Sequence, residues 1–182
     1  MSKEIDEAIH RARMKSASDR SSCCLNLFNE FTFEDLTNAK PPGRKGGKKG
    51  KGVYVIQIKS RASEAPEVIV RKVKQLVSGL KWKLVEDYVM SRIGRLIKIG
   101  PCPVIYIGSA GTQQQSKNTL KHRYAELASR HTAMYPIWAL LYFGWKLKYG
   151  WKECENPLVE EERIKKRYKD LHQGKSPALV EK

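Results

Sequence analysis

Hydrophobic and polar residues recur along the chain in patterns that predict three strands. Residues 52–59 and 104–108 are short apolar runs rich in valine and isoleucine, which is typical of strands. In residues 144–151, aromatic and aliphatic residues alternate with lysines, which is the period of a strand with one buried face. We therefore expect a small sheet built from these three segments.

Apolar residues at helical spacing fill the stretches between the predicted strands. Residues 68–99 carry two apolar stripes, which predict a helical insertion over about residues 60–100. Further helices are predicted over 120–130 and 135–143. A last helix is predicted to begin at Asn156-Pro157, with the asparagine as N-cap and the proline in the first turn. The face of this helix that is expected to point at the sheet carries Leu158, Glu161, Ile164, Tyr168 and Leu171.

The chain before the first strand divides into an arm and a basic loop. Residues 1–40 form the arm, in which 2–15 has helical spacing and 25–36 carries large apolar residues that are expected to dock on the core or on a second subunit. Residues 41–51, PPGRKGGKKGK, contain no acid and no large apolar residue. Such a segment cannot bury itself, so we expect an exposed loop that is either a plain linker or a strap that follows phosphates. Residues 52–182 then form the main domain.

The charge of the chain narrows the class of partner. It has 35 lysines and arginines against 19 aspartates and glutamates, a formal net charge of +16. An excess of this size favours a polyanion, and nucleic acid is the commonest one, although a solubilising basic surface or adaptation to heat would give the same composition. The cations predicted to contact DNA are Arg44, Lys45, Lys48, Lys49, Lys51, Lys117 and Lys121.

Neither a secretion signal nor a membrane span is expected. Residues 1–20 are charged throughout, and the longest apolar-leaning stretch, 134–145, is too short to cross a bilayer. The four cysteines are Cys23, Cys24, Cys102 and Cys154. They form no CxxC pair and no Cys/His ligand spacing, so the sequence predicts no zinc site. Scattered thiols suit a reducing cytoplasm, and Cys102 and Cys154 are expected to be small core residues.

Two tripeptides place a phenol beside a glycine on separate predicted strands. They are Gly52-Val53-Tyr54 and Tyr106-Ile107-Gly108. A tyrosine hydroxyl can donate or accept a hydrogen bond, and a glycine lets the backbone come close to a substrate. Inside so basic a chain, this pair points to chemistry on a phosphate backbone.

Four motifs, taken in order, resemble the GIY-YIG nuclease family. They are Gly52-Val53-Tyr54, Tyr106-Ile107-Gly108-Ser109-Ala110, Leu120-Lys121-His122-Arg123 and the last helix with Glu160-Glu161-Glu162. The resemblance implies an α+β fold in which a small, three-stranded, mainly antiparallel sheet is flanked by helices. Family members usually join the two tyrosine motifs by a short hairpin, whereas here the helical insertion separates them.

The same resemblance implies metal-dependent hydrolysis of phosphodiester bonds in double-stranded DNA, with Mg²⁺ as cofactor and Mn²⁺ as a substitute. It implies Glu161 as the metal ligand, with Glu160 as the close alternative. Arg123 would hold the scissile phosphate through its planar fork of donors. Tyr54 would orient or deprotonate the attacking water, and deprotonation would require nearby cations to lower its pKa. Tyr106 would orient water or phosphate.

The family often places a histidine or a tyrosine one turn after this arginine, where the present chain has Leu127. His122, Tyr124 or His131 could take that role, and the sequence leaves the three open.

Because its extra mass lies in the arm and the insertion, the chain most resembles the compact type II restriction endonucleases of the family. That resemblance implies a homodimer, since duplex cleavage at a symmetric site favours two-fold symmetry, and a cognate DNA methyltransferase as partner. A repair or structure-selective nuclease of the same family is one alternative. The other is a basic nucleic-acid-binding protein that keeps the fold without cutting. Two departures from the family pattern favour it: Leu127 after the arginine, and Val180 where the closing loop of the family often ends in asparagine.

Overall fold

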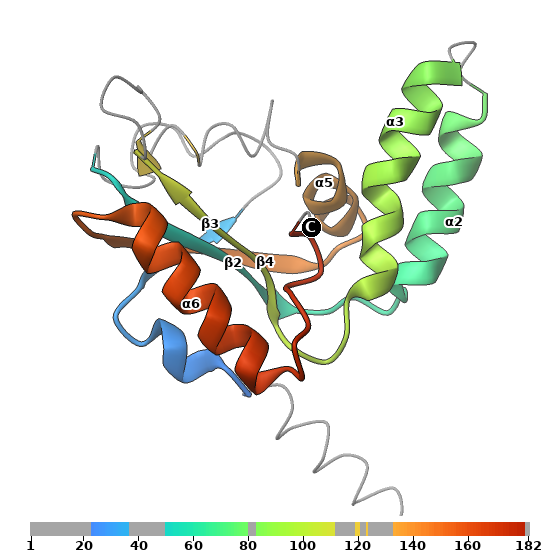
Figure 1. Ribbon diagram of the computed structural model, residues 1–182. Helices are drawn as coiled ribbons and strands as arrows, with labels where there is room; N and C mark the ends of the chain where they lie inside the picture. The colour runs from blue at the N-terminus through green and yellow to red at the C-terminus, as the bar shows by residue number, and fades with distance from the viewer. Residues whose placement is uncertain are drawn as a thin grey trace, which may run out of the picture.

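The fold belongs to the α+β class, as the sequence predicts. The computed structural model describes residues 23–36, 50–79, 83–111, 119–120, 123 and 133–180. In chain order, its elements are the 3₁₀ turn η1 (Leu25–Phe28), β1 (Thr32–Leu36), β2 (Gly52–Ser60), α2 (Pro66–Val77), α3 (Lys83–Ile93), the 3₁₀ turn η2 (Gly94–Lys98), β3 (Val104–Ala110), α5 (Met134–Tyr142), β4 (Lys146–Glu153) and α6 (Pro157–Leu171) (Figure 1). The three predicted strands are β2, β3 and β4, and the predicted insertion is the pair α2 and α3 with η2.

The sheet has four strands in the order β1-β4-β2-β3, and all neighbouring pairs are antiparallel. The prediction of three strands is therefore wrong. The fourth strand comes from the arm, whose Thr32 lies opposite Trp151 and whose Leu36 lies opposite Leu147. Without β1, strand β4 would expose an unpaired row of backbone groups, and a paired edge avoids that cost.

Gly150 on β4 leaves space for an aromatic side chain of the arm. A Cβ atom built on Gly150 would lie 2.3 Å from Cε1 of Phe33, so the aromatic ring packs directly over the glycine backbone. The arm was expected to dock on the core or on a second subunit. Its described residues, 23–36, dock on the core.

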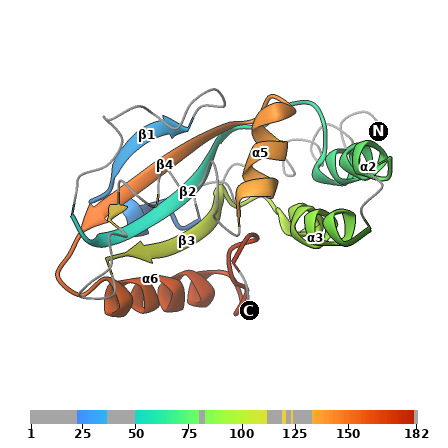
Figure 2. The same ribbon diagram turned by 90° about the horizontal axis from the view of Figure 1, so that it is seen from above.

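The sheet is buried on both faces because successive side chains of a strand point in opposite directions. On β2, Val53 and Val55 pack with Ile164 and Tyr168 of α6. Tyr54 and the isoleucines of the same strand belong to a second cluster, which includes residues of the helical insertion and of α5. Figure 2 shows α6 running alongside β3, with α5 and the α2–α3 pair gathered toward one end of the sheet.

Helix α6 departs from its sequence prediction in two details. Asn156 is its N-cap residue, but its side chain makes no capping hydrogen bond, so Pro157 alone marks the start in the predicted way. Leu158 was expected on the buried face and is 54% exposed. Leu171 is also exposed, and the apolar contacts are made by Pro157, Ile164 and Tyr168.

The segment after α6 returns to the edge strand β3. The backbone N–H of Leu179 donates to the carbonyl oxygen of Ile105 at 2.9 Å, and the Leu179 side chain is fully buried. Among the described helices, none is long and apolar enough to cross a membrane.

Candidate active site

The two tyrosines singled out in the sequence lie side by side on neighbouring strands. Tyr54 of β2 is opposite Gly108 of β3, and Tyr106 is two residues from that glycine, which is the diagonal position across an antiparallel pair. The two rings stack with centroids 5.8 Å apart and planes inclined by 22°. Tyr149 of β4 stacks on the other side of Tyr54, with centroids 5.5 Å apart. The helical insertion between the motifs therefore leaves their pairing intact.

Gly108 provides the space in which both phenols lie. A Cβ atom at this position would stand 2.8 Å from the Tyr54 hydroxyl oxygen and 2.8 Å from Cε1 of Tyr106. Real Cβ contacts are longer than this, so any side chain at Gly108 would displace both rings. The glycine of the second tripeptide is required by the packing of the two tyrosines.

Burial keeps both phenols protonated. Tyr54 is only 2% exposed, and the loss of solvent is the main reason that its pKa lies well above the ordinary value for tyrosine. Burial also raises the pKa of Tyr106, and the hydroxyls of Tyr54 and Tyr106 share a hydrogen bond. The nearby positive charge of Arg123 acts in the opposite direction on both but does not outweigh burial. The base role considered for Tyr54 required a lowered pKa, so this environment favours a neutral hydroxyl that orients a ligand.

Charged groups from two distant parts of the sequence act on Tyr106. Glu161 raises the pKa of its phenol by electrostatic repulsion of the phenolate, whereas Arg123 and Arg95 lower it by attraction. The structure thus puts the stacked pair of Tyr54 and Tyr106 within the electrostatic reach of Arg123 and Glu161, which the sequence had selected separately.

Arg123 is held near the tyrosines through its backbone. Its N–H donates to the carbonyl oxygen of Thr119 at 2.9 Å, and the N–H of Leu120 donates to Gly50 at 3.0 Å, just before β2. The Tyr149 hydroxyl donates to the carbonyl oxygen of Leu120 at 3.3 Å, while the Leu120 side chain is fully buried. The short segment that carries the arginine is therefore fixed to the sheet next to Tyr54.

The three glutamates at the start of α6 have different surroundings. Glu160 has a side chain 16% exposed and pairs with Arg163 at 2.6 Å and with Lys152 at 3.4 Å. Glu161 has a side chain 15% exposed, contacts Lys165 and is the carboxylate whose charge reaches Tyr106. Glu162 is exposed to solvent. Of the three, Glu161 is the one whose charge acts on Tyr106.

Arg95 is a site residue that the sequence reasoning missed. In the sequence it is one of several basic residues of the helical insertion. In the structure it lies on η2, half-buried, and burial lowers the pKa of its guanidinium from the ordinary value. Arg92, one turn earlier, is also half-buried and stacks over the Tyr88 ring at 5.2 Å. The only available signal was their spacing of three residues, which puts them on one side of a helix.

Several predicted residues lie outside the described part of the chain. They are His122, Arg44, Lys45, Lys48, Lys49, Lys117 and Lys121, together with Tyr124 and His131, the two alternatives to His122. Lys51 is described: it is exposed and directly precedes β2, and its carbonyl oxygen accepts a hydrogen bond from the N–H of Cys154 at 3.2 Å.

A second convergence of ligand-type side chains lies apart from the tyrosine pair. The ligand atoms of Cys23, Cys24, Cys102 and His172 all lie within 4.8 Å of one another. The spacing of the cysteines in the sequence had predicted no such grouping. This group offers soft sulfur and nitrogen donors, whereas Glu161 offers hard carboxylate oxygens. The two donor sets therefore suit different metals.

Comparisons of the chain with known protein families, with curated proteins and with solved structures found no match.

Proposed function

We propose that the protein is a metal-dependent nuclease that hydrolyses phosphodiester bonds in double-stranded DNA, as its resemblance to the GIY-YIG family implies. The observation that carries the proposal is the stacked pair of Tyr54 and Tyr106, on which the charges of Arg123 and Glu161 act. These residues stand in the order of the family's motifs. Tyr54 comes from β2 and Tyr106 from β3. Arg123 lies in the segment between β3 and α5, and Glu161 lies on α6.

The charges at the site suit a phosphodiester. Arg123 and Arg95 are the cations beside the phenols, and guanidinium groups bind phosphate oxygens through two parallel hydrogen bonds. Neutral hydroxyls on Tyr54 and Tyr106 can donate to a phosphate oxygen or orient a water molecule. The arginines therefore hold the phosphate and offset the charge that develops on it, while the tyrosines fix the direction of attack.

The donor set at Glu161 fits Mg²⁺. A single carboxylate with little exposure offers hard oxygen ligands, and Mg²⁺ characteristically uses one or two carboxylates while keeping several waters. The Lys165 ammonium contacts the same carboxylate, so a bound metal ion would have to replace this ion pair. When bound, Mg²⁺ would neutralise phosphate charge and lower the pKa of a coordinated water, and Mn²⁺ would substitute for it.

Within this proposal, the enzyme acts as a site-specific restriction endonuclease. One active site cuts one strand, so cleavage of both strands at a symmetric sequence is achieved by a two-fold symmetric homodimer. A restriction enzyme of this kind is accompanied in the cytoplasm by a DNA methyltransferase that protects the host sequence. A repair or structure-selective nuclease would instead nick DNA without a fixed sequence.

One observation favours a second function, DNA binding without cleavage. Glu161 contacts Lys165 within the same helix, and a carboxylate held permanently in that pair would not be open to a metal. The two functions differ in whether a divalent metal changes the DNA.

Plasmid cleavage with and without Mg²⁺ or Mn²⁺ tests the proposal. The informative pair of variants is Glu161→Gln and Glu162→Gln, since the two glutamates are adjacent and only the first lies beside Tyr106. We expect metal-dependent cutting by the wild type and by Glu162→Gln, and none by Glu161→Gln, with DNA binding kept in all three. Binding without cutting at any metal concentration would favour the second function, and equal cutting by both variants would remove Glu161 from the site. Sequencing of the cut ends separates restriction from repair, because discrete ends at one short sequence are expected only for restriction.

A further inference from the structure

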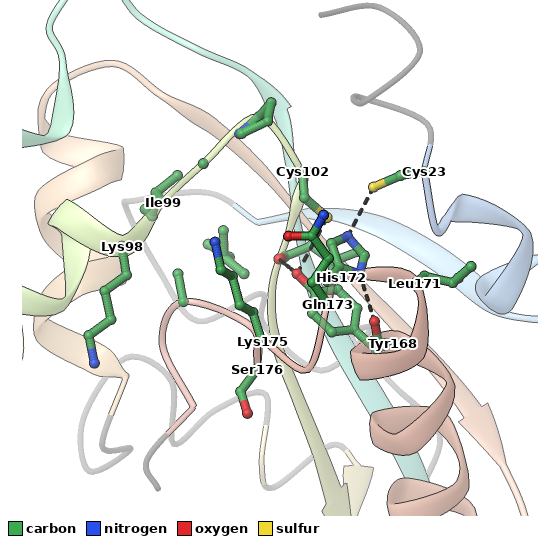
Figure 3. Close-up of a pocket in the computed structure, with 15 residues that line it drawn as sticks. Cys23, Lys98, Ile99, Cys102, Tyr168, Leu171, His172, Gln173, Lys175 and Ser176 are labelled. Carbon is green, nitrogen blue, oxygen red and sulfur yellow. Dashed lines mark hydrogen bonds between the residues drawn. The ribbon is translucent and has the colours of Figure 1, made fainter. Parts of the chain in front are cut away.

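Three segments far apart in the sequence meet at one end of α6. Cys23 and Cys24 stand at the start of the described arm, Cys102 lies just before β3, and His172 directly follows the last residue of α6. Figure 3 shows the Cys23 sulfur and the His172 ring pointing toward one another, with Cys102 beside them. Cys24 is 1% exposed, and the other three are partly buried.

The histidine presents a lone pair to the cysteines. Its Nδ1 lies 2.7 Å from the carbonyl oxygen of Tyr168, and a carbonyl oxygen can only accept, so Nδ1 carries the proton and donates it. In the neutral imidazole, the other ring nitrogen, Nε2, then carries the lone pair, and it lies 3.0 Å from Sγ of Cys23. Stacking on the Tyr168 ring, with centroids 3.9 Å apart and planes inclined by 11°, fixes the orientation of the imidazole. The hydrogen bond from Nδ1 to the Tyr168 carbonyl oxygen is of the kind that metal-bound histidines almost always make with the nitrogen that does not bind the metal.

The four ligand atoms are close enough together to surround one zinc ion after small movements. Zinc bonds of about 2.3 Å to sulfur place the ligand atoms of a tetrahedron about 3.7 Å apart. Sγ of Cys24 lies 3.5 Å from Sγ of Cys102, Sγ of Cys23 lies 3.0 Å from Nε2 of His172, and no pair in the group exceeds 4.8 Å. Small movements of the side chains would bring all four atoms into register around one ion.

We infer that Cys23, Cys24, Cys102 and His172 bind one zinc ion in a closed structural site. Three thiolates and one imidazole are a standard set for structural zinc, and thiolates select zinc over Mg²⁺. The site is separate from the proposed magnesium site, since Glu161 lies near the start of α6 and His172 directly follows its last residue, about 16 Å further along the helix axis. The inference therefore holds or fails independently of nuclease activity.

The surroundings of the group also support metal binding. Cys23, Cys102 and His172 help to line a cavity of about 590 Å³, which provides a path by which an ion can enter (Figure 3). Zinc binding requires deprotonated thiols, and a bound cation itself favours the thiolate form.

The consequence for the fold is an anchor for the arm. The described arm supplies two of the four ligands and also the edge strand β1. A metal that joins it to the start of β3 and to the end of α6 would hold three non-local segments together, and its binding free energy would add to the stability of the folded chain.

Metal analysis of the full-length chain tests the inference. We expect the protein, expressed with zinc and purified without chelator, to carry about one zinc ion per chain. Dialysis against a chelator under reducing conditions should remove it, lower the thermal midpoint and allow stoichiometric reloading with zinc chloride alone. Cobalt chloride added to the metal-free chain should give the absorption of thiolate-to-cobalt charge transfer.

Cysteine variants assign the ligands. Cys102→Ser and His172→Gln should bind zinc at least about tenfold more weakly than the wild type. Cys154→Ser is the matched control, because Cys154 is the one cysteine outside the group, and it should bind zinc as the wild type does. Circular dichroism checks that each variant is folded, and Cys23→Ser, at a half-exposed position, replaces any variant that is not.

Two results would overturn the inference. One is a wild-type chain that holds no metal as purified and takes none from zinc chloride, a measurement that requires no variant. The other is alkylation of Cys24 and Cys102 that becomes possible after a reductant and not after a chelator, which would show that these two form a disulfide instead.

Discussion

The hydroxyl oxygen of Tyr54 lies 2.8 Å from the point that a Cβ atom of Gly108 would occupy. The absence of a side chain on β3 is thus what allows the phenol on β2 to lie beside Tyr106. The two tripeptides therefore form one structural unit, because the phenol of the first occupies the space that the glycine of the second leaves open.

Gly108→Ala is therefore expected to disturb both rings at once. The added methyl group meets two buried aromatic side chains, and overpacking of this kind costs about 1–3 kcal/mol of unfolding free energy. Cleavage activity should fall by a larger factor than stability alone explains, because the phenols are displaced. Urea unfolding and plasmid cleavage measure the two effects. Gly94→Ala is the control, since a Cβ atom there meets nothing within 4 Å, and a similar loss in that variant would contradict the explanation.

The buried phenol of Tyr54 predicts a loss of stability at alkaline pH. Its pKa is raised in the folded state by burial, so the unfolded chain releases this proton at a lower pH than the folded chain does. The stabilisation is complete below the unfolded pKa of about 10 and is lost as the pH rises toward the folded value. In Tyr54→Phe the decline of the unfolding free energy above that pH should be shallower than in the wild type. Parallel curves for the two proteins from neutral to alkaline pH would show that Tyr54 is not buried as described.

Glu160 is expected to contribute to stability and not to catalysis. Its hydrogen bond with Arg163 is the main cause that lowers its pKa, and Lys152 adds to the effect. A carboxyl whose folded pKa is depressed stabilises the protein above its unfolded pKa, and this stabilisation is lost as the pH falls through the folded value. Glu160→Gln should therefore lower the unfolding free energy at neutral pH by about 1 kcal/mol or less, with little difference in acid.

The same variant should cleave DNA at the wild-type rate, in contrast to Glu161→Gln. Chemical denaturation at neutral and acidic pH, together with plasmid cleavage, provides the comparison. A Glu160→Gln enzyme that is stable but inactive would transfer the metal-binding role to Glu160, the alternative that the sequence had left open.

The sequence predicted these strands and the last helix because each has its own hydrophobic pattern or a proline that marks its start. The apolar runs of β2 and β3, the alternation in β4 and Pro157 at the start of α6 are all readable over a few residues. It missed β1 because Thr32–Leu36 is short and includes Glu34 and Asp35, so that only pairing with β4 defines it as a strand.

Some residues of the candidate site could also be predicted from the sequence, and others could not. Tyr54, Tyr106, Arg123 and Glu161 could be selected because they match an ordered set of motifs. Arg95 could not, since nothing local distinguishes it from the other cations of the insertion, and only the fold brings it to Tyr106. The cysteine and histidine group was missed for a related reason: its spacing matches no ligand motif, because three separate segments supply the ligands.

Arg95 provides the last prediction, because it belongs to the helical insertion and its charge acts on Tyr106 in the proposed phosphate site. If its guanidinium contacts the DNA backbone near Tyr106, then Arg95→Ala should weaken DNA binding and reduce the dependence of log affinity on log salt concentration by about one phosphate contact. Arg95→Lys should keep most of the salt dependence, since the charge remains, but lose cleavage through the loss of the planar fork. Arg71→Ala, at an exposed position on α2, is the matched control and should cleave normally. Fluorescence titration of a DNA duplex at several salt concentrations measures binding, and equal salt slopes for Arg95→Ala and the wild type would exclude Arg95 from the interface.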